Sequence, residues 1–98
     1  GVDKSSADKA LAGHGPTAVA IGNAFSDANH ITEARFWYRI AAENGSAIGM
    51  NNYSIAVSEF DCRRSIYWLQ KAISQGTLDS KTQAAMRKEL EEATASCK

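Results

Sequence analysis

The chain has 98 residues, which is enough for one small domain with a single core, so we treat residues 1–98 as one domain. Apolar residues make up 44% of the chain and charged residues 22%, and the 11 basic side chains balance the 11 acidic ones. A nucleic-acid-binding protein usually carries a basic excess that neutralises phosphates, so this balance argues against a nucleic-acid partner. No apolar run approaches the roughly 20 residues that a membrane-spanning helix needs, so we expect no membrane insertion.

The first predicted element is a helix over residues 3–13. We expect it to cover an apolar flank near Leu11, Val19 and Phe25, whereas an uncovered flank would favour a dimer. The chain starts with Gly1 rather than Met, and no signal peptide is visible in it. We therefore expect that a leader has been removed or that the chain begins within a longer protein.

A glycine-rich stretch, GHGPTAVAIG at residues 13–22, opens the next helix. Phosphate groups bind at such helix starts, but this stretch lacks the Lys and Ser/Thr of a P-loop and follows no strand. We interpret it as a loop that ends where Pro16 enters the first helical turn.

Residues 16–46 are expected to form a helical hairpin. In its short first helix, Ile21, Gly22 and Phe25 share one face. The second helix has apolar residues at i, i+3, i+4, i+7 and i+8, which is one face of an α-helix: Ala34, Trp37, Tyr38, Ala41 and Ala42. Thr32 stands at the expected N-cap, and Gly45 at the expected left-handed residue after the helix.

Residues 47–77 are expected to form a second hairpin of the same kind. Its short helix carries Tyr53, Ser54 and Val57 at the corresponding positions. For the second helix, over residues 62–75, Asp61 stands at the expected N-cap and Gly76 at the expected left-handed residue after the helix. Its apolar stripe repeats the spacing of the first: Ser65, Trp68, Leu69, Ala72 and Ile73.

The two hairpins are related by a fixed period. Trp68 lies 31 positions after Trp37. The same interval separates Ala41 from Ala72 and Gly45 from Gly76. A constant period of this size is typical of helical repeat arrays, in which each hairpin packs on the next. The small residues Gly22 and Ser54 let a neighbouring helix approach closely. The sequence therefore predicts an all-α fold, an α-α superhelix of two hairpins.

In these residues the chain resembles the Sel-one-like repeat family, a relative of the tetratricopeptide repeat. The matching positions of the first copy are Ala18, Ile21-Gly22, Phe25, Glu33-Ala34, Trp37, Ala41-Ala42 and Gly45. The second copy departs further, because Tyr53-Ser54 replaces Leu-Gly, Val57 replaces the aromatic residue, and Arg64-Ser65 replaces Lys-Ala. The resemblance covers about residues 16 to 78 and implies a protein-protein interaction module.

The last predicted element is a longer amphipathic helix over residues 79–96 that closes the array. Ser80 with Gln83 fits a capping box at its start. Its apolar stripe consists of Thr82, Met86, Leu90, Ala93 and Cys97. A helix that is apolar inside and polar outside suits the end of a repeat array.

The chain has two cysteines, Cys62 and Cys97. If the helices that contain them run antiparallel, residues 93–97 return close to residue 62 and the thiols can form a disulfide. The alternative is a pair of unrelated thiols. A bridge would indicate an oxidising compartment, either the periplasm or the outside of the cell. Metal binding is not expected, because neither cysteine has a second Cys or His at ligand spacing.

We find no pattern that indicates catalysis, and we expect neither an enzyme nor a cofactor. His14 and His30 lie in predicted loops, and no serine has a nucleophile-elbow context. A deep pocket that contained His30 with Asp27 and Arg35 would favour an enzyme instead. The tryptophans are expected in the core, whereas Phe36 and Tyr67, one position off the stripe in each copy, are expected to be partly exposed.

The resemblance implies that the short helices line the concave side of the array. The outward positions expected to contact a partner are Val19, Asn23, Ser26 and Asp27 in the first copy and Asn51, Ile55, Ser58 and Glu59 in the second. The preferred hypothesis is a non-catalytic periplasmic or secreted bacterial adaptor or inhibitor, such as an immunity protein that neutralises a toxin. The alternative is a structural or assembly component of an envelope complex. The partner's identity and the oligomeric state stay open.

Overall fold

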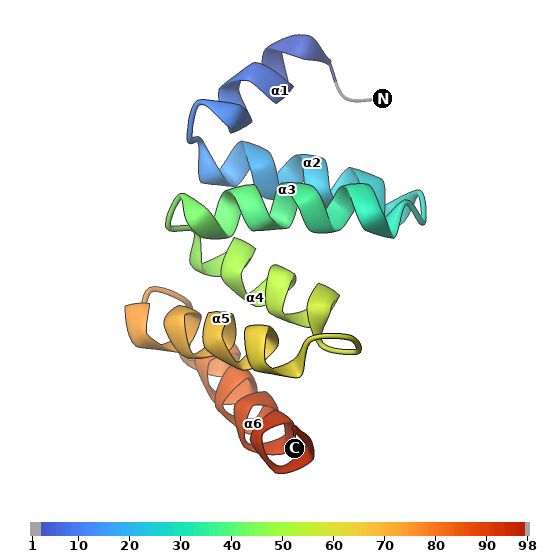
Figure 1. Ribbon diagram of the computed structural model, residues 1–98. Coiled ribbons are helices and arrows are strands. Elements are labelled where there is room, and N and C mark those ends of the chain that lie inside the picture. Colours follow the sequence, from blue (N-terminus) through green and yellow to red (C-terminus); the bar gives the residue numbers. More distant parts are fainter. Residues whose placement is uncertain (1–2, 98) are drawn as a thin grey trace.

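The computed structural model describes residues 3–97, and this part of the chain contains six α-helices and no strand (Figure 1). In chain order they are α1 (Lys4–Leu11), α2 (Gly15–Asp27), α3 (Ile31–Glu43), α4 (Ala47–Val57), α5 (Cys62–Gln75) and α6 (Ser80–Ser96). The chain occupies about 41 × 26 × 19 Å. The predicted all-α fold class is confirmed.

The helices pack as two antiparallel hairpins with an additional helix at each end of the stack. Helices α2 and α3 form the first hairpin, α4 and α5 form the second, and the hairpins contact each other mainly through α3 and α4. Figure 1 shows these layers stacked in chain order, with α1 at one end and α6 at the other. Each helix thus buries its apolar stripe against the next one, as expected for a helical-hairpin stack.

The starts of two helices differ from the sequence prediction. Thr32 is not an N-cap, because Asn29 adopts a left-handed conformation (φ 63°) and the carbonyl of His30 already accepts the Ala34 N–H at 3.0 Å. Helix α3 therefore begins at Ile31.

At α6 the cap is Asp79 rather than Ser80. The Asp79 carboxylate accepts the backbone N–H of Thr82 at 2.7 Å, so Ser80 lies inside the first turn. The Gln83 side chain does not return to the cap; it is buried and donates to the Ile73 carbonyl at 3.1 Å. The predicted capping box is therefore wrong. Asp61 caps α5 as expected, accepting from the Arg64 N–H at 3.1 Å.

Small residues allow close helix contacts at three levels of the stack. A Cβ atom on Gly22 would lie 2.5 Å from the Tyr38 ring, which packs directly on α2. In the second hairpin the buried Ser54 hydroxyl lies 2.7 Å from the Ser65 carbonyl, and the Ser65 hydroxyl lies 2.8 Å from the Ser54 carbonyl. Each serine thus satisfies a polar group of the other helix.

The third close contact joins the two hairpins. A Cβ atom on Gly49 of α4 would lie 2.5 Å from the Ala41 Cβ and 3.0 Å from the α3 backbone. Only glycine permits this separation, since the neighbouring backbone atoms cannot move independently of the helix. Gly49 therefore sets the distance between the two hairpins.

Two clusters of buried side chains form the core. The larger one connects both hairpins to α6 and consists of Ala34, Tyr38, Ala42, Met50, Tyr53, Val57, Leu69, Ala72 and Met86. The smaller one lies at the first hairpin and contains Ala10, Ala18, Val19, Ile21 and Ala41. Trp68 packs against the larger cluster and Trp37 against the smaller one, and both tryptophans are partly buried. Helix α1 covers the start of the stack only in part, because Leu11 stays 58% exposed.

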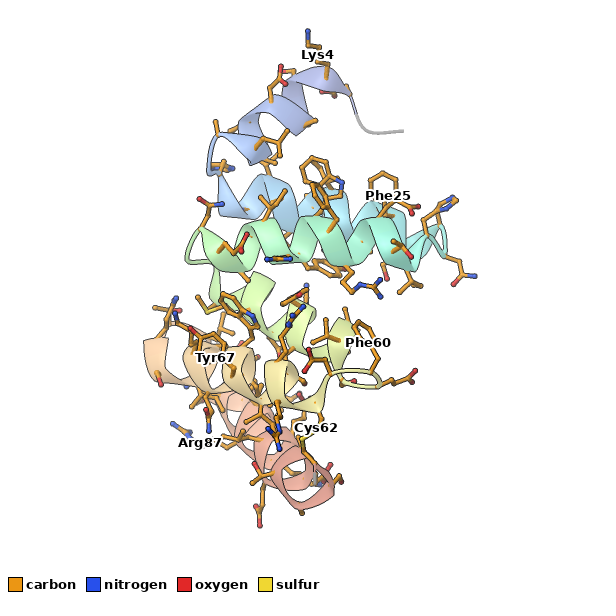
Figure 2. All side chains as sticks on the ribbon, in the orientation of Figure 1. Lys4, Phe25, Phe60, Cys62, Tyr67 and Arg87 are labelled. Carbon is orange, nitrogen blue, oxygen red and sulfur yellow. A yellow bond between two sulfur atoms is a disulfide. The ribbon has the colours of Figure 1, made fainter. Side chains whose placement is uncertain are left out.

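A disulfide joins the start of α5 to the end of α6. Cys62 and Cys97 are bonded, with their Cα atoms 5.7 Å apart, and Figure 2 shows Cys62 at this point. Helix α6 buries only Gln83 and Met86 fully, both in its first half, while Leu90 and Ala93 are half-buried. The disulfide therefore fastens the half of α6 that packs least well, and the expected cysteine pairing is confirmed.

Candidate functional site

A groove of about 430 Å³ lies between the two hairpins. It lies beside the ends of the hairpins where α2 turns into α3 and where α4 ends. Its walls are formed by Ser26, Ile31, Ala34, Tyr38, Asn52, Ile55, Ala56, Ser58 and Glu59. We call these nine residues the inter-hairpin groove.

Apolar side chains lie exposed at this groove. Ile31 at the start of α3 is 46% exposed, and Ile55 on α4 is 55% exposed. Phe60, in the connection between α4 and α5, directly follows the groove residue Glu59 and is 61% exposed (Figure 2). Exposed apolar side chains that gather at a concave surface with a polar rim are typical of an interaction site.

The floor of the groove includes the buried ring of Tyr38. Its hydroxyl donates a hydrogen bond to Asn23 Oδ1 at 2.7 Å, which connects α3 to α2. Burial raises the pKa of the Tyr38 phenol above its usual value, an effect that a hydrogen bond with Ser26 partly offsets and the nearby charge of Asp27 reinforces. The hydrogen bond to Asn23 fixes the phenol as a polar group of the groove.

Arg35 extends from α3 to the exposed Phe60. Its guanidinium carbon lies 4.8 Å from the centre of the Phe60 ring, within the range of a cation–π contact. This contact spans the opening between the hairpins, because Arg35 belongs to the first hairpin and Phe60 to the second.

The structure brings half of the sequence-predicted partner residues to the groove. Ser26, Ile55, Ser58 and Glu59 line it, and they come from both hairpins. Asn23 is exposed beside it, with its amide oxygen engaged by Tyr38. The others lie elsewhere: Asp27 is exposed outside the groove, Asn51 is half-buried, and Val19 is buried.

Val19 corrects the prediction of an outward, partner-facing position. It is only 9% exposed and belongs to the smaller core cluster with Ala10 of α1. The reason is that α1 packs on this side of α2 and covers it. The side of α2 that was predicted to face a partner is thus part of the core, where it packs against α1.

Sequence reasoning missed the groove residues Ile31, Ala34 and Tyr38 of α3 and the groove residues Asn52 and Ala56 of α4. Ile31 was placed before the helix, yet it starts α3 and enters the groove. Arg35 and Phe60 meet only because the hairpins stack. A useful signal would have been Phe60 itself, because a large aromatic residue between two predicted helices has no place on either apolar stripe.

The two copies repeat an aromatic pair on the outer face. Phe36 is 55% exposed and Tyr67 is 52% exposed, and each ring makes an edge-to-face contact with the tryptophan that follows it. Lys71 lies over the Tyr67 ring at 5.3 Å and donates to its hydroxyl at 3.3 Å (Tyr67 is labelled in Figure 2). These positions are outside the inter-hairpin groove.

The histidines act locally. The His14 side chain accepts the Thr17 N–H at 3.2 Å and caps α2, while His30 Nδ1 lies 3.3 Å from the Glu33 carboxylate. In residues 3–97 no group of three or more His, Cys, Asp and Glu side chains is placed to hold a metal ion. Within the same residues, none of the helices has both the length and the apolar character needed to cross a membrane.

Comparison with known proteins finds no matching family model, no matching curated protein and no matching solved structure. The resemblance to Sel-one-like repeats therefore remains a prediction from the repeat positions.

Proposed function

We propose that the protein is a non-catalytic module that binds another protein through the inter-hairpin groove. The observation that carries this proposal is the combination of a concave surface with half-exposed apolar side chains at Ile31 and Ile55, next to the exposed Phe60. Contacts of this kind are favoured by burial of apolar area, at about 25 cal/mol per Å². The polar groups of the groove supply orientation, since they match the backbone and side chains of a protein segment.

We further propose that the module works in an oxidising compartment, as a periplasmic or secreted protein. The Cys62–Cys97 disulfide supports this location, because such bonds persist where thiols are not kept reduced. A small domain that must stay folded outside the cytoplasm also benefits from a covalent connection between its last two helices.

The most specific form of the proposal is an adaptor or inhibitor of one exported protein, such as an immunity protein that neutralises a toxin. The exposed side chains of Ile31 and Ile55 suit contact with a few inserted side chains of the partner. Inhibition would result if the partner's inserted segment formed part of its own active site.

Ile55 and Ile48 provide a matched test of the groove. Both are isoleucines on α4 and about equally exposed, at 55% and 50%, but only Ile55 lines the groove. We expect a photo-crosslinking residue at position 55, in the cell that makes the protein, to yield a single protein adduct that position 48 does not.

The variants Ile55→Glu and Ile48→Glu extend the test to binding. Both should fold, because each replaces a half-exposed side chain. Ile55→Glu is expected to abolish binding of the crosslinked partner, and Ile48→Glu is expected to retain it. Equal crosslinking at both positions, or equal binding by both variants, would exclude the groove as the binding surface.

A further inference from the structure

We propose that the inter-hairpin groove recognises a partner segment in which an acidic residue adjoins an apolar one, with Arg35 as the residue that binds the carboxylate. This inference rests on the proposed function and specifies the chemistry of the partner. The occupant is an internal segment of a protein chain, with its apolar side chain in the groove and its Asp or Glu at Arg35.

The first argument is the charge of Arg35. In the part of the chain that the structure describes, the ion pairs use other basic groups: Arg39 with Glu43, Arg64 with Asp61, and His30 with Glu33. Arg35 takes part in none of them. It is also only half exposed, so its charge lies partly within the protein surface without a carboxylate partner.

The second argument is the orientation of Arg35. The cation–π contact with Phe60, in which the guanidinium carbon lies 4.8 Å from the ring centre, holds the Arg35 guanidinium at the opening between the hairpins. A guanidinium held in this way has lost much of its rotamer freedom, and its planar array of donors matches a carboxylate in a bidentate arrangement. Arginine and aromatic side chains of this kind dominate the energetics of many protein interfaces.

The third argument is the apolar surface that adjoins this charge. Ile31 lies one turn before Arg35 on the same face of α3 and lines the groove, together with the exposed side chain of Ile55 and the buried Ala34. A segment that places a carboxylate on Arg35 therefore places its neighbouring side chain against apolar walls. Glu59 also lines the groove, so a run of several acidic residues would be repelled there.

The test uses a library of random 12-residue peptides displayed on phage, selected against the oxidised protein. The peptides are fused at their C-terminus, so a selected carboxylate must come from a side chain. We expect enrichment of peptides with Asp or Glu next to a large apolar residue. A synthetic peptide from the selection should bind at least tenfold more weakly when its acidic residue is replaced by the amide.

Arg39 supplies the matched control. It lies one turn further along α3, is exposed and is already paired with Glu43, so R39Q and R35Q remove the same charge from the same helix. We expect R35Q to weaken the selected peptide at least tenfold and R35K to weaken it by a smaller factor, while R39Q changes binding less than threefold. Circular dichroism of each variant verifies that it is folded.

The outcomes separate this inference from the proposed function. If selected peptides lose binding with Ile55→Glu but carry no acidic residue or ignore R35Q, the groove binds protein segments and the role of Arg35 is refuted. If no peptide is enriched, or if the selected peptides ignore both Ile55→Glu and R35Q, the inference and the proposed function both fail.

Discussion

Removal of the Cys62–Cys97 disulfide is expected to destabilise the fold strongly. The double variant Cys62→Ser/Cys97→Ser removes the bond without leaving a free thiol. The bonded residues are 35 positions apart in sequence. For a closed loop of that length, the chain-entropy relation predicts that the bond stabilises the folded state by about 4 kcal/mol at 25 °C. Domains of this size have a total stability of only about 5–15 kcal/mol, so the expected loss is a large share of it.

The effect should be measured by urea unfolding, monitored by circular dichroism at 222 nm. The oxidised protein should unfold at a higher urea concentration than the double variant. By the entropy relation, the unfolding free energy of the double variant should be about 4 kcal/mol lower. The urea dependence should also become steeper, because the unfolded chain without the bond exposes more surface. In thermal unfolding the same loss corresponds to a decrease of roughly 15–30 °C in Tm.

Reductant provides the internal control. The native protein with reductant should match the double variant, and the double variant itself should be insensitive to reductant. The loss of stability should be most evident at the end of α6, where Leu90 and Ala93 are only half-buried. In the double variant, the amides of residues 88–96 should therefore exchange hydrogen faster than those of the other helices. A loss below about 1 kcal/mol would refute the chain-entropy reasoning for this bond.

Three further predictions follow from the packing and the pKa shifts. Gly49→Ala should destabilise the protein by about 2 kcal/mol in urea unfolding, because overpacking against α3 outweighs the gain in helix propensity. Adding Ala41→Gly should restore part of the loss, and a double variant whose loss is the sum of the two single losses would contradict the contact. The hydrogen bond from the Thr82 N–H lowers the pKa of Asp79 below 3.8, so this carboxylate stabilises the fold above that pH and the effect is lost as the pH falls through the lowered pKa. Asp79→Asn should reduce the fall in stability at acid pH, and an equally steep fall would refute the cap. Burial raises the pKa of Tyr38 above 10.0, so the contribution of the neutral phenol to stability is present below that pH and is lost as the pH rises through the raised pKa. Tyr38→Phe should reduce the fall in stability at alkaline pH, and an equally steep fall would contradict the burial of the phenol.

Several features of the fold were predictable because they depend on local periodicity. The 3.6-residue spacing of Trp37, Tyr38 and Ala41 specifies one apolar helix face wherever the helix lies. The interval of 31 residues to the second copy indicates that the same packing recurs. Helix starts were less predictable, because several neighbouring residues could serve as the N-cap. The backbone conformation decides among them, and it selects His30 instead of Thr32 and Asp79 instead of Ser80.

The sequence by itself determined the helices and their pairing into hairpins, and it predicted that Cys62 meets Cys97 if the last two helices run antiparallel. These features follow from short-range spacing and from the antiparallel return of one helix along another. Only the tertiary structure decided which surfaces stay open. Val19 became part of the core because α1 packs on it, and Arg35 reached Phe60 because the close contact at Gly49 sets the distance between the hairpins. A groove between two hairpins depends on how they stack, which is a long-range property that no single helix pattern contains.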